Sequence, residues 1–217
     1  MNIEQARFNM IEQQIRPWEV LDQAVLQLLA VVKREDFLPP ALRALAFVDT
    51  EVPLSEGQCM LAPRVEARLL QELKVQRHES VLEVGAGSGF MAALLGHRAR
   101  QVITLDNRPA LARMASENLR RAGVTNVQVR EADGRNGLAD EGPYDAIILS
   151  GSVASVPQTL LAQLKPGGRL ITIEGAEPIM QAVLYTAQPG GAYAKSILFD
   201  TVAQRLDGFA EPTRFHF

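Results

Sequence analysis

The feature that most constrains the fold is a regular alternation of β-branched runs and helical segments that begins at Ser80. The helical segments lie near 89–99, 108–122 and 156–164, and they separate the strand-like runs VLEV (81–84), QVITL (101–105), VQVR (127–130), DAIIL (145–149) and GRLITI (168–173). Strands that alternate with helices of this length form parallel βαβ units. The pattern predicts an α/β fold with a doubly wound, mostly parallel sheet.

The end of the pattern predicts a different kind of sheet edge. Two further strand-like runs, AVLYTA (182–187) and YAKSILF (193–199), are joined by the turn sequence QPGG. Short runs joined by a glycine-rich turn are typical of a hairpin, whose strands are antiparallel. We therefore expect the far edge of the sheet to be antiparallel.

The first 75 residues follow a helical pattern instead. Apolar residues recur with helical spacing after Asp22, a residue type that caps helices, and again after Pro63, which suits a first helical turn. The segment between these helices, VDTEVPLSEGQCMLAP (48–63), has turn residues and no clear period, so it is expected to be a loop. We expect a single domain, with a helical N-terminal extension over 1–75 and an α/β core over 76–217 that ends in the hairpin.

Composition excludes several classes of protein. The 22 basic and 25 acidic residues give a net charge of −3, which disfavours bulk binding to nucleic acid. A single cysteine, Cys59, and three scattered histidines, His78, His97 and His216, predict neither a disulfide framework nor a metal site. No run approaches the roughly 20 apolar residues of a membrane helix, and the N-terminus lacks a signal-peptide pattern. We expect a cytoplasmic protein without nucleic-acid or membrane partners.

A glycine-rich loop, EVGAGSG (83–89), leaves the first strand of the alternating pattern and opens a helix. Glycines let the backbone turn tightly and approach a ligand, and a helix N-terminus favours an anionic group. The spacing differs from the Gly-x-Gly-x-x-Gly of dinucleotide-binding folds, and no Gly-Lys-Ser/Thr follows as in a P-loop. Glu83, two residues before the first glycine, would face a ligand group that prefers a negative partner.

Acidic residues follow the next two strands. Asp106 ends the second strand, where an acid can bind ribose hydroxyls, and Asp133 follows the third, where it can accept a hydrogen bond from an adenine amine. Taken singly, Asp106 is more often a helix cap and Asp133 a turn residue. Parallel strand ends share one crevice, however, so the glycine loop and both acids would line it together.

An adenosine that carries an amino acid fits this set better than one that carries a pyrophosphate. S-adenosylmethionine is such a ligand, because its carboxylate suits the helix end and its ammonium suits acidic surroundings. We therefore expect a site for this cofactor. Its expected residues are Glu83, Gly85, Ala86, Gly87, Ser88, Gly89, Asp106, Asn107, Asp133 and Gly134.

Longer segments carry a resemblance that covers about residues 7–175. They are MIEQQI (10–15), REDFLPPALRALAFVD (34–49), VLEVGAGSGF (81–90), ADGRNG (132–137), YDAIILSG (144–151) and VPQTLLAQLKPGGRLI (156–171). In these segments the chain resembles the protein-L-isoaspartate O-methyltransferases. The resemblance implies the Rossmann-like class I methyltransferase fold, S-adenosylmethionine as methyl donor, and methylation of the carboxylate of isoaspartyl residues in damaged proteins. It also implies that Gly85, Gly87, Gly89, Asp106 and Asp133 bind the cofactor.

One loop departs from that family. The family loop reads Gly-Gln-Thr-Ile-Ser-x-Pro, and its serine lies beside the transferred methyl group and the substrate carboxylate. This chain has Cys59 in place of the threonine and Leu61 in place of the serine, which removes a hydrogen-bond donor. Leu61, at the family serine position, and Cys59, a weak donor, are the catalytic candidates, and Gln58 and Met60 belong to the expected substrate loop.

This departure leaves two alternatives open. The first is a methyltransferase of the same fold with a different acceptor, for example a small molecule held in an apolar pocket beside Met60 and Leu61. The second is a cofactor-binding protein with little catalytic activity.

Overall fold

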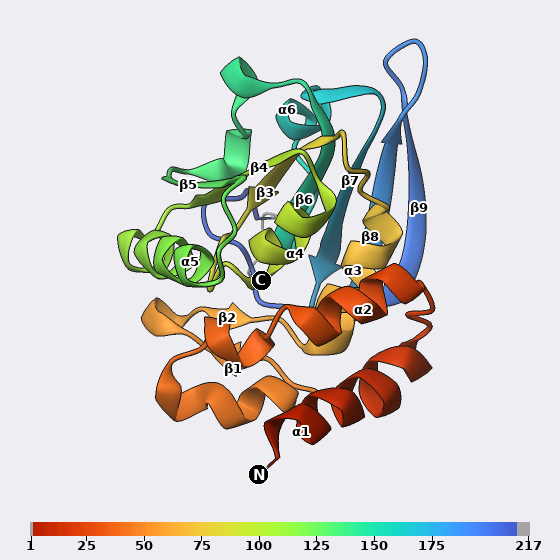
Figure 1. Ribbon diagram of the computed structural model, residues 1–217. Helices are drawn as coiled ribbons and strands as arrows, with labels where there is room; N and C mark the ends of the chain where they lie inside the picture. Colours follow the sequence, from red (N-terminus) through yellow and green to blue (C-terminus); the bar gives the residue numbers. More distant parts are fainter. Residues whose placement is uncertain (1, 212–217) are drawn as a thin grey trace, which may run out of the picture.

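The computed structural model describes residues 2–211 and contains a central seven-stranded sheet (Figure 1). The strand order is β5-β4-β3-β6-β7-β8-β9. The strands are β3 (Ser80–Val84), β4 (Gln101–Asp106), β5 (Val127–Glu131), β6 (Tyr144–Val153), β7 (Leu164–Ala176), β8 (Ile179–Ala187) and β9 (Tyr193–Asp200). The strands from β5 to β7 pair in parallel, whereas β8 and β9 pair antiparallel. The predicted parallel sheet and its antiparallel far edge are both confirmed.

Side chains alternate between two hydrophobic cores, one on each face of the sheet. Val81 and Ile148 belong to the core that the N-terminal helices complete, whereas Leu82 and Ile147 belong to the core on the opposite face. This division follows from the two-residue period of a strand. Strands buried on both faces read as nearly continuous apolar runs, which is why the sequence revealed them.

Helices cover both faces. Their bounds are α1 (Ile3–Met10), α2 (Gln23–Val31), α3 (Pro63–Leu73), α4 (Phe90–Arg98), α5 (Pro109–Arg121) and α6 (Gln158–Leu161). As the sequence predicted, the Asp22 side chain caps α2, where it accepts a 2.8 Å hydrogen bond from the backbone N–H of Ala24, and α3 begins at Pro63. The prediction of a helix over 156–164 was wrong in length. The helix α6 is a single turn that begins after Pro157, and the chain enters β7 at Leu164.

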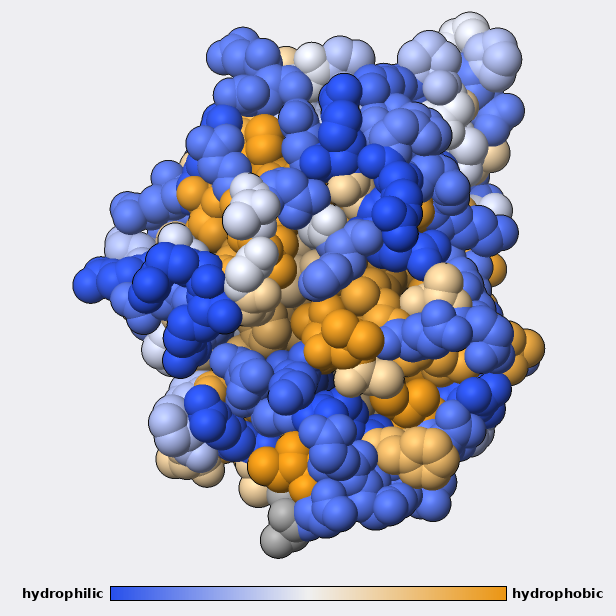
Figure 2. All heavy atoms as spheres, in the orientation of Figure 1, coloured by the Kyte–Doolittle hydropathy of each residue, from blue (hydrophilic) through white to orange (hydrophobic). Residues whose placement is uncertain are grey.

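The N-terminal extension packs beneath the sheet in the view of Figure 1. Between α1 and α2 the chain continues as a π turn, Ile11–Ile15, and a 3₁₀ turn, Arg16–Trp18. Two more 3₁₀ segments, Arg34–Phe37 and Pro40–Phe47, follow α2. Figure 2 shows a mostly hydrophilic face on which apolar surface gathers where the extension meets the sheet and its helices. The division of the chain at residue 75 stays a prediction.

The segment over 48–63 is more ordered than the sequence suggested. It contains a short antiparallel ladder in which β1 (Val52–Pro53) pairs with β2 (Cys59–Met60), and the 3₁₀ turn Ser55–Gly57 lies between them. Two-residue strands are too short to produce a recognisable period, which is why the sequence predicted only a loop.

No helix within residues 2–211 has the length and apolar character needed to cross a membrane. The same residues contain no group of three or more His, Cys, Asp or Glu side chains that could hold a metal ion. His216 lies outside the described residues.

Candidate active site

The glycine loop between β3 and α4 has a backbone that demands glycine. Gly85, Gly87 and Gly89 have φ values of +93°, +52° and +83°, in the left-handed region that side chains disfavour. A Cβ on Gly89 would lie 3.1 Å from the backbone of Ala115 in α5, so close packing also excludes a side chain there. The backbone N–H of Gly85 donates a 2.8 Å hydrogen bond to the carbonyl of Leu105, which joins the loop to β4.

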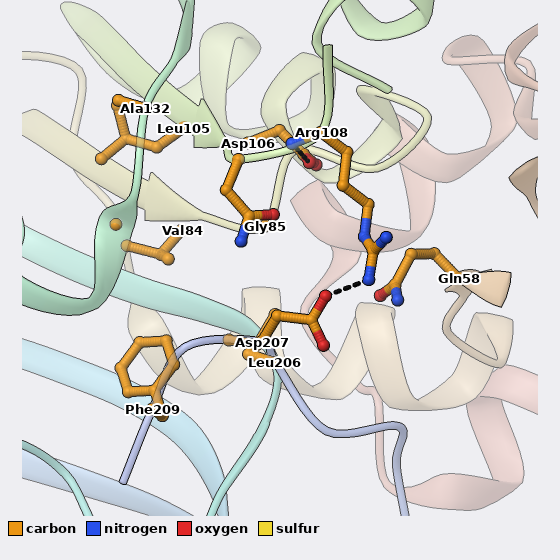
Figure 3. A pocket seen from close by; sticks show the side chains of 12 residues that line it. Gln58, Val84, Gly85, Leu105, Asp106, Arg108, Ala132, Leu206, Asp207 and Phe209 are labelled. Carbon is orange, nitrogen blue, oxygen red and sulfur yellow. Dashed lines mark hydrogen bonds and ion pairs between the residues drawn. The ribbon is translucent and has the colours of Figure 1, made fainter. Parts of the chain in front are cut away.

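A cavity of about 380 Å³ opens at the carboxyl ends of β3 and β4 (Figure 3). Its lining residues are Gln58, Val84, Gly85, Leu105, Asp106, Asn107, Arg108, Ala132, Gly134, Leu206, Asp207 and Phe209. We call this space the first cavity. It lies where parallel strand ends were expected to form a ligand crevice.

Asp106 connects the end of β4 to the glycine loop. Its carboxylate accepts hydrogen bonds from the backbone N–H groups of Gly87 at 2.9 Å and Arg108 at 3.0 Å. Burial raises the pKa of Asp106, and these two donors and the Arg108 charge oppose that rise. A carboxylate has about four acceptor positions, so two remain for hydroxyl groups of a ligand.

A second cavity of about 310 Å³ shares Gly85 with the first. Its lining residues are Cys59, Met60, Leu61, Glu66, Glu83, Gly85, Ala86, Gly87, Ser88, Phe90, Met91 and Ser150. None of these described lining residues is a lysine or an arginine. The second cavity combines an apolar wall from the substrate loop with the carboxyl groups of Glu83 and of Glu66, which pairs with the buried Arg34.

Glu83 is the carboxyl group that the cavities bury most completely. Its side chain is 0% exposed and accepts hydrogen bonds from Ser150 Oγ at 2.6 Å and Thr104 Oγ1 at 2.7 Å. Burial raises the pKa of Glu83 to about 8, against the effect of the two hydroxyl donors. Since a nearby cation favours the ionised form, Glu83 is suited to receive a positively charged group of a ligand.

The substrate loop lies where the sequence placed it, beside the glycine loop. Cys59, Met60 and Leu61 line the second cavity, and Gln58 lines the first. The fully buried guanidinium of Arg34 donates a 2.7 Å hydrogen bond to the carbonyl of Leu61, which fixes the backbone of the loop.

The surroundings of Cys59 favour its protonated thiol over the thiolate. Burial, followed by the charge of Glu51 and a hydrogen bond to it, raises the pKa of Cys59 to about 12. The thiolate is the nucleophilic form of cysteine. Cys59 is therefore suited to weak hydrogen bonding and packing rather than to nucleophilic attack.

Two expected cofactor residues line neither cavity. Gly89 instead caps α4. Asp133 caps the 3₁₀ turn Gly134–Asn136, where its carboxylate accepts a 3.0 Å hydrogen bond from the backbone N–H of Arg135 and pairs with the Arg135 side chain. Gly134 does line the first cavity, and a Cβ there would lie 2.4 Å from Val84 Cγ1. The roles assigned to Gly89 and Asp133 stay predictions.

The arrangement of these loops can be compared with known proteins. The family model described as protein-L-isoaspartate(D-aspartate) O-methyltransferase (PCMT) matches residues 5–195. The chain belongs to this family. The resemblance found in residues 7–175 is therefore confirmed.

Curated members of the family are similar over most of the chain. A protein-L-isoaspartate O-methyltransferase from Methanoculleus marisnigri is 38% identical over 184 residues, which are 85% of this chain and 84% of that protein. One from Herpetosiphon aurantiacus is 40% identical over 168 residues, 77% of this chain and 75% of that protein.

Solved structures show the same fold. A protein-L-isoaspartate O-methyltransferase structure superposes with a TM-score of 0.78 at 22% identity, covering 93% of this chain and 66% of that chain. A structure from Plasmodium falciparum, in complex with S-adenosyl-L-homocysteine, has a TM-score of 0.76 at 23% identity and covers 93% of this chain and 98% of that chain. The predicted Rossmann-like class I methyltransferase fold is confirmed.

Sequence reasoning missed the C-terminal wall of the first cavity. Leu206, Asp207 and Phe209 follow the hairpin and carry no periodic pattern. Their position depends on long-range contacts, such as the 2.9 Å hydrogen bond from the Leu206 N–H to the carbonyl of Ser152. The family match ends at residue 195, so this wall also lies beyond the matched segment.

Proposed function

We propose that this chain is an S-adenosylmethionine-dependent protein-L-isoaspartate O-methyltransferase, which methylates the carboxylate of isoaspartyl residues in proteins or peptides. The observation that carries the proposal is the meeting of the glycine loop, Asp106 and the substrate loop at two adjoining cavities, in a chain that belongs to this family over residues 5–195. Family membership does not favour the two alternatives, a small-molecule acceptor or a weakly catalytic cofactor-binding protein.

The residues of the two cavities fit S-adenosylmethionine. Glu83 is a buried carboxyl group without a cationic partner among the described residues, and the amino group of the cofactor would supply one. Asp106 retains acceptor positions for ribose hydroxyls, and Val84 and Gly134 line the first cavity beside it, where the base would lie. When bound, the cofactor supplies a sulfonium methyl group with a neutral thioether as leaving group.

The chain needs no general base for this reaction. An isoaspartyl carboxylate is ionised at neutral pH, because its ordinary pKa lies near 4. The protein must instead align the acceptor oxygen with the methyl carbon and exclude water, which supplies up to roughly 7–11 kcal/mol of the barrier reduction. Met60, Leu61 and Phe90 provide the apolar wall that excludes water, and Arg34 holds the carbonyl of Leu61 in place.

Leu61 lowers the expected efficiency of the enzyme. A hydroxyl at this position would donate a hydrogen bond to the acceptor carboxylate, and a leucine cannot. A hydrogen bond to a charged group contributes about 1.5–3 kcal/mol, which corresponds to roughly a tenfold to hundredfold change in rate. We therefore propose slow turnover that retains isoaspartyl selectivity.

The proposal extends to location and partners. It places the protein in the cytoplasm, supported by a sequence with one cysteine, and it includes no nucleic-acid or membrane partner, supported by a net charge of −3. The residue roles are those of the expected site: Glu83 and the glycine loop for the amino acid end of the cofactor, Asp106, Asn107, Asp133 and Gly134 for its nucleoside, and residues 58–61 for the acceptor.

A three-arm assay tests the proposed activity. S-adenosylhomocysteine release is measured with an isoaspartyl peptide, with the same peptide containing ordinary aspartate, and without acceptor. We expect release only with the isoaspartyl peptide, and a catalytically weakened Asp106→Asn variant serves as the control for cofactor dependence. Cofactor binding without turnover on the isoaspartyl peptide would contradict the proposal.

A further inference from the structure

The side chain of Arg108 extends along the first cavity toward Asp207. It caps the N-terminus of α5, and its backbone N–H donates to the carboxylate of Asp106. Its guanidinium lies at the cavity beside Gln58 and reaches Asp207 on the opposite wall (Figure 3). One residue therefore touches both Asp106, inside the cavity, and the wall that encloses it.

The guanidinium of Arg108 pairs with carboxylates from two distant segments. Its Nη1 lies 3.4 Å from Oε2 of Glu56 in the turn before the substrate loop, and its Nη2 pairs with Oδ2 of Asp207 in the C-terminal segment. Glu56 has a φ of +56°, a conformation that a non-glycine residue adopts only when its surroundings hold it. Arg108 is part of those surroundings.

The same two segments also meet directly. Gln204 Nε2 donates a 2.6 Å hydrogen bond to the carbonyl of Gly57. Leu206 fills the space above Gly85 and Gly151, where added Cβ atoms would lie 2.9 Å and 2.7 Å from its side chain. The segments 55–58 and 204–209 thus meet beside the first cavity, which Gln58, Leu206, Asp207 and Phe209 line, and Arg108 pairs with a carboxylate of each segment.

We propose that Arg108 is a positioning residue that closes the cofactor cavity and sets the rate at which the cofactor leaves. In this proposal the guanidinium, paired with Asp207, obstructs the opening through which a nucleoside would leave the first cavity. Release therefore requires the ion pairs to Glu56 and Asp207 to open first. This inference rests on the proposed function, which places the cofactor in the first cavity.

The rate of S-adenosylhomocysteine release tests the proposal. Labelled S-adenosylhomocysteine bound to the full chain is chased with an excess of unlabelled compound. Arg108→Met retains an apolar stem but loses both ion pairs, and we expect release to be about twofold to tenfold faster, the effect of losing one or two partly exposed ion pairs. Asp207→Asn should give part of this increase, and the double variant should release no faster than Arg108→Met alone.

Arg130→Met is a matched control. Arg130 forms a 2.8 Å ion pair with Glu141 and is 28% exposed, close to the 24% of Arg108, but it lies outside both cavities. We expect this variant to release S-adenosylhomocysteine at the wild-type rate. Raising the NaCl concentration to about 0.5 M should accelerate release from the wild type and leave Arg108→Met nearly unchanged, since salt screens exposed pairs.

The peptide KM separates closure from a merely structural role. Closure predicts that Arg108→Met accelerates release by a larger factor than it changes the KM for the isoaspartyl peptide, and that it lowers the melting temperature of the unliganded protein no more than Arg130→Met does. Equal release rates for wild type and Arg108→Met, or equal acceleration by Arg130→Met, would overturn the inference. Failure of the wild type to bind S-adenosylhomocysteine would instead refute the proposed function. If Arg108→Met does not fold, an unchanged release rate in Asp207→Asn would overturn the inference.

Discussion

The affinity for S-adenosylmethionine should depend on pH through Glu83. In the unliganded protein burial raises the pKa of Glu83 to about 8, so the group is mostly protonated at neutral pH. The cofactor ammonium favours the carboxylate and lowers this pKa in the complex. Binding therefore releases a proton, and affinity must increase as the pH rises toward 8.

The size of the effect follows from the two pKa values. If the complex restores a value near the ordinary 4.3, affinity should rise by about tenfold per pH unit well below pH 8, and by roughly 75-fold between pH 5.5 and 7.5. The pH range ends at 7.5 because an α-amino group titrates near 7.7–8.0, so the amino group of the cofactor is still mostly charged at that pH. At pH 7 the released proton should amount to about 0.9 per cofactor bound.

Isothermal titration calorimetry measures both quantities. The dissociation constant is obtained at several pH values, and the proton count from buffers with different ionisation enthalpies. Glu83→Gln keeps the size of the side chain and one acceptor oxygen but cannot titrate, so its affinity should depend on pH much less than that of the wild type. The dependence that remains should come from Glu66, whose pKa burial raises to about 7. Glu66 and Asp106 act on the pKa of Glu83, so an equal pH dependence in Glu83→Gln would assign the proton to one of them. That result, or a flat wild-type profile, would refute the reasoning.

Other variants test neighbouring parts of the account. Leu61→Ser should raise isoaspartyl turnover by roughly tenfold to hundredfold while Leu61→Ala does not, and equal rates in steady-state assays would remove Leu61 from the acceptor site. Gly134→Ala should lower the free energy of unfolding by about 1–3 kcal/mol in urea titrations, because its Cβ would lie 2.4 Å from Val84 Cγ1, and wild-type stability would show that the site relaxes freely. Cys59→Ala should change the turnover number by less than about twofold, since a thiol with a pKa near 12 is not a nucleophile at neutral pH, and loss of activity would show otherwise.

Local sequence patterns were enough to predict most of the fold. Buried strands such as β3 and β6 are apolar on both faces, and their alternation with amphipathic helices determines a parallel sheet. The shortening of α6 was not predictable from its apolar spacing, because the start of β7 at Leu164 depends on pairing with Tyr144. Pairing across the sheet overrides local helical preference there.

The site was predictable where a motif lies on one continuous segment. Gly85, Gly87 and Asp106 were found because a glycine loop and an acid at a strand end have recognisable positions. Arg108 and Asp207 were not found, since their importance arises from an ion pair between segments far apart in the chain. The elevated pKa of Glu83 likewise depends on burial, which no local pattern reveals.

A crystal structure of the protein with S-adenosylhomocysteine tests the central claim most directly. The account predicts density for the nucleoside between Asp106 and Gly134, with the amino group of the ligand beside Glu83 and the sulfur facing residues 59–61. Density at another location, or both cavities empty at a saturating ligand concentration, would contradict it.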